Sequence, residues 1–378
     1  MEYRKMIILL LSIAYVAAAD LAPLHTHTTD AVAGRFIVAL KAESPDVDTF
    51  LGSLITMDGI TMTRTYRDAA LKGFAAGLTD DALQMLREQP EVGYVEQDSI
   101  VRADWVASWG LDRVDQRHLP LDNKAFFQGN GAGVNAYIID TGIFPDNRFF
   151  SDRAYVAYDN VGDGKEGIDC NGHGTHCAGT IGGEVFGIAR EASLHGVRVL
   201  DCAGSGSTSS ILDGMDFVAK NAKHPAVASI SLRSPQSEAM EEAVRRMNDA
   251  DVTVSVSAGN SAGDACNQSP ASAKEAITVG ATDIEDQRAS FSNYGKCVDL
   301  FAPGVDIPSL WMGEDFAVNI ISGTSMSCPH VSGAAVIARG NDPSLKAAEV
   351  KAKILKDATP DVVKNPGPDS PNLMLYIP

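Results

Sequence analysis

The sequence is short of positive charge. It holds 31 lysine and arginine residues against 49 aspartate and glutamate residues, a formal net charge of −18. A chain this acidic is poorly suited to bind nucleic acid or anionic lipid, so we expect neither as a partner. Internal repeats and low-complexity tracts are also missing. Beyond the N-terminus, no apolar run reaches the roughly 18 residues that a membrane-spanning helix needs.

The N-terminus carries the one conspicuous apolar run, which extends from Met6 to about Val16 behind two basic residues. Three alanines follow at 17–19, and small residues in this place are typical of a signal-peptide cleavage site. We therefore predict a signal peptide over residues 1–19 and a secreted, extracellular protein. A membrane anchor is the alternative, but the run is too short to span a bilayer.

Cysteine is scarce, with six residues in the chain, and the first is Cys170. Some of them should pair in a secreted protein, but their number does not choose a pairing. The stretch before them begins with a polar lead-in at 20–34, which we expect to be flexible. From about Arg35, strands are predicted at 36–40, 73–78 and 92–96, and helices at 46–55 and 79–88. This pattern predicts a small α+β unit.

After Ser108, β-branched runs alternate with helical stretches. Strands are predicted at 134–139, 193–200, 227–232 and 252–258, and helices at 207–222 and 238–249. This alternation predicts an α/β fold with a mostly parallel sheet and helices on both faces. Functional residues in such sheets lie beyond the carboxyl ends of the strands.

Two candidate residues follow this rule. Asp140 ends an apolar strand, where turn amides could fix its carboxylate, although an Asp there usually only caps a turn. His173 lies between glycines, and a pKa of about 6.5 suits a histidine to act as a general base. Alternatives for His173 are a packed core histidine or a metal pair with His176. The metal motif H-E-x-x-H is absent, so we expect His176 to be structural.

Two further candidates lie later in the chain. Ser325 follows an apolar strand at 318–321 and begins a helix of small residues, where backbone amides and the helix dipole could stabilise an oxyanion. A plain N-cap serine is the alternative. Asn260 follows a buried strand and a glycine, so its amide could donate to the same oxyanion. A turn asparagine is the simpler interpretation of that residue taken alone.

Together, the segments IIDTGI, NGHGTHCAG, SAGN and GTSMSCPHVSG resemble the subtilisin family of serine proteases, in its proteinase K and aqualysin branch. The similarity extends from about Trp109 to Tyr376. It implies a subtilisin-like three-layer fold and a serine endopeptidase that cuts proteins or peptides through an acyl-enzyme, as a monomer. By this resemblance Ser325 is the nucleophile, His173 the base and Asp140 its orienting group, and Asn260 binds the oxyanion.

The resemblance also assigns a substrate cleft. Its edges would be Gly204-Ser205-Gly206 on one side and Ser231-Leu232 on the other, with the peptide added as a strand. The family usually has glycines after the Ser-Leu pair, whereas this chain has Arg233. Arg233 either narrows the primary specificity pocket or points to solvent, so the preferred P1 side chain is open.

Two structural features are implied by resemblance alone. Cys170 would pair with Cys202 and Cys266 with Cys297, which leaves Cys177 and Cys328 as free buried thiols; a nucleophilic role for Cys177 is disfavoured. A structural Ca²⁺ ion would be bound by the carboxylate of Asp299 and the carbonyl groups of Lys274 and Ala276, because calcium prefers oxygen ligands.

The α+β unit resembles the inhibitory propeptide of the family, a small ferredoxin-like fold. This implies a zymogen with a propeptide at 20–102 that blocks the cleft, self-cleavage near Arg102-Ala103, and a catalytic domain at 103–378. A binding protein on the same fold, kept closed by a retained propeptide, is the competing function. An α/β-hydrolase esterase is disfavoured because G-x-S-x-G is absent and the residue order Asp, His, Ser is wrong for it.

Overall fold

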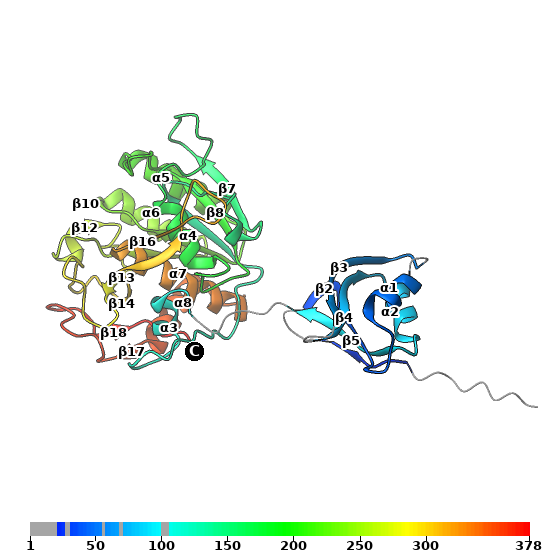
Figure 1. Ribbon diagram of the computed structural model, residues 1–378. Helices are drawn as coiled ribbons and strands as arrows, with labels where there is room; N and C mark the ends of the chain where they lie inside the picture. Colours follow the sequence, from blue (N-terminus) through cyan, green and yellow to red (C-terminus); the bar gives the residue numbers. More distant parts are fainter. Residues whose placement is uncertain (1–20, 27–30, 55–56, 68–70, 100–105) are drawn as a thin grey trace, which may run out of the picture. The chain divides into compact units, whose positions relative to one another are not determined.

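The computed structural model describes residues 21–26, 31–54, 57–67, 71–99 and 106–378 (Figure 1). The signal peptide predicted at 1–19 and the cleavage site near Arg102-Ala103 lie outside these residues. The chain forms two compact units, Met1–Ala103 and Asp104–Pro378. In the ranges that are described, no helix combines the length and apolar character needed to cross a membrane.

The first unit is a five-stranded sheet with two helices, and its strand order is β1-β5-β2-β4-β3. Its elements are β1 (Leu24–His25), β2 (Ala31–Leu40), α1 (Val47–Ser53), β3 (Ile60–Arg67), β4 (Lys72–Leu78), α2 (Asp80–Arg87) and β5 (Val92–Ser99). All neighbours pair antiparallel except β1 and β5. The succession β2-α1-β3-β4-α2-β5 is the ferredoxin-like pattern that the resemblance implied.

One apolar core holds the first unit together. Val38, Phe74 and Val95 of the sheet pack in the same cluster as Phe50 of α1 and Leu86 of α2. Both helices begin at side-chain caps, where Asp46 and Thr79 accept hydrogen bonds from backbone amides. The sequence prediction missed β3, which has no buried residue, and it took β1 and the first residues of β2 for a flexible lead-in.

The second unit is built on a nine-stranded sheet with the order β17-β18-β14-β13-β11-β9-β6-β8-β7. Its strands are β6 (Asn135–Asp140), β7 (Ala154–Asp159), β8 (Ser193–Arg198), β9 (Ala226–Ile230), β11 (Val252–Ser257), β13 (Ile277–Thr282), β14 (Leu300–Pro303), β17 (Thr359–Pro360) and β18 (Leu373–Met374). Within this sheet, as far as it is described, only the edge pair β17–β18 is antiparallel, so the predicted mostly parallel sheet is confirmed.

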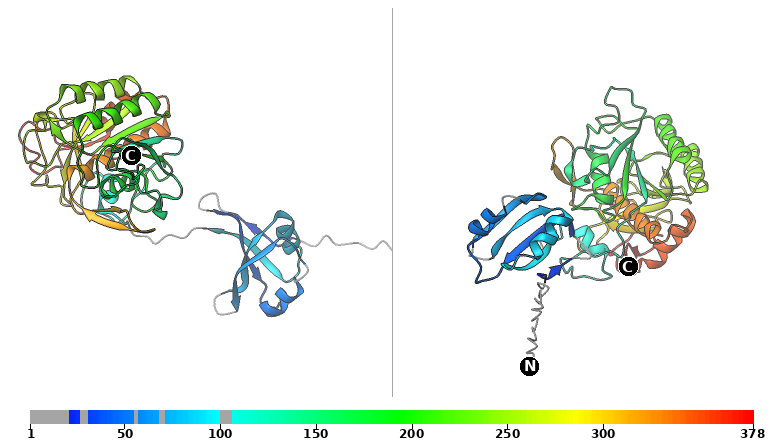
Figure 2. Two further views of the ribbon diagram at one scale, coloured as in Figure 1. Left: turned by 90° about the horizontal axis from the view of Figure 1, so that it is seen from above. Right: turned by 90° about the vertical axis from the view of Figure 1, so that its right-hand side faces the viewer.

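Helices cover both faces of this sheet (Figure 2). They are α3 (Trp109–Val114), α4 (His173–Gly182), α5 (Thr208–Asn221), α6 (Glu238–Asp249), α7 (Thr324–Asn341) and α8 (Ala347–Asp357). Alternate residues of β6 enter different cores: Ile138 belongs to the core that also contains residues of α4, α7 and α8, whereas Ile139 belongs to the core of α5 and α6. The fold is therefore the three-layer α/β arrangement that was predicted.

Two small pairs of strands lie outside the main sheet. β15 (Ile307–Leu310) pairs antiparallel with β16 (Val318–Ile321), and β10 (Ser234–Pro235) pairs with β12 (Gln268–Ser269). The strand expected at 318–321 therefore exists, but it belongs to a hairpin with an exposed face rather than to the parallel sheet.

Candidate active site

The carboxylate of Asp140 and the imidazole of His173 meet at the carboxyl edge of the sheet. Asp140 is the last residue of β6 and is fully buried, while His173 is the first residue of α4. His173 Nδ1 lies 2.7 and 2.9 Å from the two oxygens of Asp140. Burial acts to lower the pKa of His173, but the charge and hydrogen bond of Asp140 outweigh it and raise this pKa above its usual value.

Ser325 and Asn260 reach the same region from other elements. Ser325 is the second residue of α7, and its hydroxyl donates to Ser231 O at 3.2 Å. Asn260 follows β11, and its Oδ1 accepts from the amide and the hydroxyl of Thr324 at 2.9 and 2.8 Å. Because Oδ1 is bound in this way, the amide NH₂ of Asn260 is the group left to donate toward the cleft.

The loop before α4 is organised by Asp169, which sequence reasoning passed over. Its buried carboxylate accepts from the amides of Asn171, Gly172 and Thr175 and from the hydroxyl of Thr141. Thr141, which follows Asp140, and the first turn of α4 are therefore both held by the carboxylate of Asp169. The local pattern gave no signal for this role, because burial of an aspartate cannot be read from its neighbours.

Close backbone approach explains one of the glycines beside His173. A Cβ atom at Gly174 would lie 2.2 Å from the carbonyl oxygen of Gly142. Any side chain there would push α4 away from the end of β6, and the contact between His173 and Asp140 would be lost.

A cleft of about 560 Å³ opens above these residues. Its lining includes His173, Asn260 and Ser325 together with both predicted edges, Gly204-Ser205-Gly206 and Ser231-Leu232. Arg233 also lines the cleft and is exposed, so it lies at the rim rather than filling the interior. His173 and Arg233 are the only ionisable side chains among the lining residues of the described chain.

Neighbouring groups that could compete for the chemistry are buried. His176 is fully buried and binds Ile307 O through Nε2, and burial lowers its pKa to about 3. The thiols of Cys177 and Cys328 are free and buried, and burial raises the pKa of Cys177 well above its usual value. A thiol held in its neutral form is a poor nucleophile, which leaves Ser325 as the candidate.

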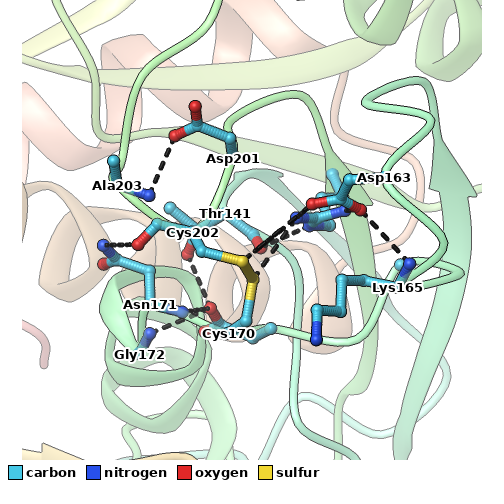
Figure 3. Close-up of a disulfide and its surroundings, with 12 residues drawn as sticks. Thr141, Asp163, Lys165, Cys170, Asn171, Gly172, Asp201, Cys202 and Ala203 are labelled. Atoms are coloured by element: carbon cyan, nitrogen blue, oxygen red, sulfur yellow. Dashed lines mark hydrogen bonds and ion pairs between the residues drawn. A yellow bond between two sulfur atoms is a disulfide. The ribbon is translucent and has the colours of Figure 1, made fainter.

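Both disulfides implied by the resemblance are present: Cys170–Cys202 and Cys266–Cys297. Figure 3 shows the first of them between Asn171 and Asp163. Next to it, the buried guanidinium of Arg198 donates to both oxygens of Asp163 at 2.7 Å and to Thr141 O at 3.2 Å. The hydrogen bond from Arg198 lowers the pKa of Asp163 to about 2. The disulfide loop is thus linked to the residue that follows Asp140.

The three predicted calcium ligands come together, but around a side chain of the protein. The ammonium group of Lys351 donates to Lys274 O, Ala276 O and Asp299 Oδ2 at 2.9, 2.5 and 2.9 Å. A cation already lies where the ion was expected, so these residues as arranged do not fit a bound Ca²⁺.

A buried carboxylate, an imidazole and a serine hydroxyl at the carboxyl edge of a parallel sheet, with amide donors beside them, define a serine protease of the Asp-His-Ser type. Comparison with known families agrees: residues 131–372 match the subtilase family, and residues 35–104 match the peptidase inhibitor I9 family. The chain belongs to the subtilase family. It is a serine endopeptidase made as a zymogen with its own inhibitory propeptide.

Individual relatives support this placement. The extracellular serine proteinase of Thermus sp. (strain Rt41A) is 47% identical over 92% of this chain and 90% of its own length. The alkaline serine exoprotease A of Vibrio alginolyticus is 43% identical over 92% of this chain and 68% of its own length. A crystal structure of a cold-adapted subtilisin-like serine proteinase matches 73% of this chain and 99% of its own, with 44% identity and a TM-score of 0.70.

Proposed function

We propose that Ser325 attacks the scissile carbonyl while His173 accepts its proton and Asp140 holds the imidazole. The contact of His173 Nδ1 with Asp140 at 2.7 Å carries this proposal. It fixes the tautomer in which Nδ1 bears the proton, so the lone pair of Nε2 is free to act as the base. The Ser325 hydroxyl turns from Ser231 O toward the imidazole when substrate enters, and His173 later gives the proton to the leaving amine.

The oxyanion of the tetrahedral intermediate binds to the side-chain amide of Asn260 and the backbone amide of Ser325. The anchoring of Asn260 Oδ1 by Thr324 supports this role, because it orients the amide donors without cost at the moment of reaction. The Ser325 amide belongs to the first turn of α7, where backbone donors have no partner within the helix. Water then hydrolyses the acyl-enzyme.

The substrate is an extended peptide that pairs with the two cleft edges, Gly204–Gly206 and Ser231–Leu232. Arg233 gives the rim a positive charge that favours a carboxylate near the scissile bond. One chain suffices for catalysis, since every proposed catalytic group comes from the second unit. Calcium has no part in the proposed chemistry.

The precursor has three parts in this proposal: a signal peptide at 1–19, a propeptide at 20–102 and a catalytic domain at 103–378. The division of the chain after Ala103 and the inhibitor-family match at 35–104 support the second boundary. Secretion is supported by the Thermus relative, which is an extracellular proteinase. The released propeptide acts as an inhibitor of its own catalytic domain.

Expression of the precursor with and without Ser325→Ala tests the chemistry. We expect the wild-type chain to acquire a new N-terminus near residue 103, found by mass spectrometry, and to digest casein. The Ser325→Ala chain should stay whole and lose activity by about 10⁶, the magnitude measured for subtilisin, a relative in this family. We expect removal of the hydroxyl to leave the fold intact, since Ser325 Oγ makes a single hydrogen bond to the part of the chain that the structure describes.

Ser327→Ala is the matched control, because Ser327 lies on the same helix and its hydroxyl donates to Ala302 O, away from the cleft. This variant should process itself and digest casein. A wild-type precursor that stays whole and digests nothing would favour the binding protein on the same fold and reject the protease mechanism.

A further inference from the structure

Lys351 lies in the middle of α8 and its side chain ends among three oxygen atoms of other segments. Two are carbonyl oxygens, of Lys274 and Ala276, in the loop before β13. The third is Oδ2 of Asp299, which precedes β14. An ammonium group has three N–H donors and no acceptor, so these contacts use its whole hydrogen-bonding capacity.

This arrangement differs from an ordinary surface ion pair. The side chains of Lys351 and Asp299 are only 20% and 23% exposed. On the same helix, Lys353 pairs with Asp357 one turn away and is 42% exposed. The Lys353 contact is local to one helix, whereas Lys351 connects α8 to the starts of two strands of the central sheet.

The oxygen atoms around Lys351 form a set suited to a hard cation. Carboxylate and carbonyl oxygens directed at one point are typical ligands of a divalent metal ion. A metal ion at that point would lie in contact with the ammonium group, and two positive charges so close repel strongly. We infer that the ammonium of Lys351 takes the place of a metal ion as the permanent cation of this site.

Removal of the ammonium has a predictable effect on the oxygens. Asp299 Oδ2 also accepts from the amide of Thr278 at 2.8 Å, so one partner stays after the lysine is lost. The two carbonyl groups and most of the carboxylate charge would then lack a cation. Lys351→Met keeps the unbranched side chain up to the position of Cε and removes the ammonium group, so it should convert the position into an open site for Ca²⁺.

The test uses the full chain carrying Ser325→Ala, which cannot digest itself. Bound Ca²⁺ is counted by equilibrium dialysis, and the unfolding temperature is followed by tryptophan fluorescence in EDTA and in millimolar calcium chloride. The variants are Lys351→Met, Asp299→Asn, the two combined, and Lys353→Met as the matched control on the same helix.

We expect Asp299→Asn alone to bind as many Ca²⁺ ions as the parent chain, whatever other sites contribute. Lys351→Met should bind one ion more, and the combined variant should lose it again. In EDTA, Lys351→Met should unfold about 3–6 °C below the parent, with calcium restoring the difference, while Lys353→Met stays at the parent value.

Any of four results would overturn the inference. A lost ion in Asp299→Asn alone would mean that calcium displaces the ammonium in the native chain. No added ion in Lys351→Met, or no recovery of its unfolding temperature with calcium, would mean that these oxygens are not a cation site. An unchanged unfolding temperature of Lys351→Met in EDTA would mean that the ammonium stabilises nothing.

Discussion

The second unit contains a fully buried ion pair besides its exposed ones, whereas the pairs described in the first unit are exposed or partly exposed. In the first unit, Arg67 and Asp48 form a pair whose side chains are 64% and 61% exposed. In the second, Arg113 and Asp286 form a pair that is 0% and 5% exposed. An exposed pair contributes little to stability, whereas a buried charge that loses its partner is costly. The second unit should therefore be far more sensitive to the loss of a charge from its buried pair than the first unit is to the loss of a charge from Arg67–Asp48.

The two units also differ in their disulfide bonds and in the number of their apolar cores. The first unit has no cysteine, and one apolar core holds it together. The second has two disulfides and separate cores on the two faces of its sheet. A small unit with one core is marginally stable, which suits a propeptide that must be removed, while two disulfides and two cores stabilise the second unit.

The substitution Asp286→Asn should have the largest effect on stability, and it tests the difference between the two units most directly. Asp286 has a φ of 63°, a left-handed conformation that asparagine tolerates, so the backbone should be preserved. Arg113 donates to both carboxylate oxygens, and the change leaves its buried charge without a counter-ion. We expect the second unit to lose about 3–5 kcal/mol of free energy of unfolding, measured by denaturant titration.

Asp48→Asn provides the matched control in the first unit. It removes the same kind of charge from an arginine pair, but both partners are exposed to water. The unfolding midpoint of the first unit should not change beyond experimental error. Equal losses in the two variants would remove the distinction between the units.

Replacing Cys266 and Cys297 by serine should have the next largest effect. The bond closes a sequence separation of 31 residues, and on a loop-entropy model its loss costs about 3–4 kcal/mol. All three tryptophans lie after residue 103, so their fluorescence reports on the second unit alone. Its transition should move to lower denaturant while the transition of the first unit, followed by circular dichroism, stays in place.

The smallest effect concerns Arg233, an exposed arginine of the second unit that lines the cleft and that we propose to act on substrate rather than on stability. Arg233→Met should leave the unfolding temperature unchanged and lower kcat/KM about three- to tenfold for peptides with a carboxylate near the scissile bond. Neutral peptides should be cut as before. A high salt concentration should reduce the preference of the wild-type enzyme for these acidic peptides, because the charge of Arg233 is solvent-exposed. A preference that persists in high salt would mean that the shape of the cleft, and not the charge of Arg233, selects the peptide.

The sequence predicted most of what depends on local pattern. The strands around 135–140, 226–230 and 252–257 and the two long helices α5 and α6 were expected nearly in place, because buried parallel strands and amphipathic helices have distinct periods. The prediction did not include the main-sheet strands β7, β13 and β14 or the mostly exposed β3.

Tertiary partners were harder to predict. Asp140, His173, Asn260 and Ser325 could be proposed together only through family resemblance, since 185 positions separate Asp140 from Ser325. The role of Asp169 depends on burial, and the position of Lys351 depends on the docking of α8 against the sheet. Neither property can be read from neighbouring residues. The sequence therefore could not show that a lysine lies where the calcium ion was expected.

The ammonium of Lys351 also changes what controls the occupancy of its site. A diffusible ion binds by mass action, so its occupancy follows the concentration in the medium and falls on dilution or chelation. A cation attached to a helix has an effective concentration set by the chain itself. Occupancy of the site at Asp299 then depends on whether α8 stays folded and docked against the sheet. It does not depend on the concentration of a metal ion in the medium.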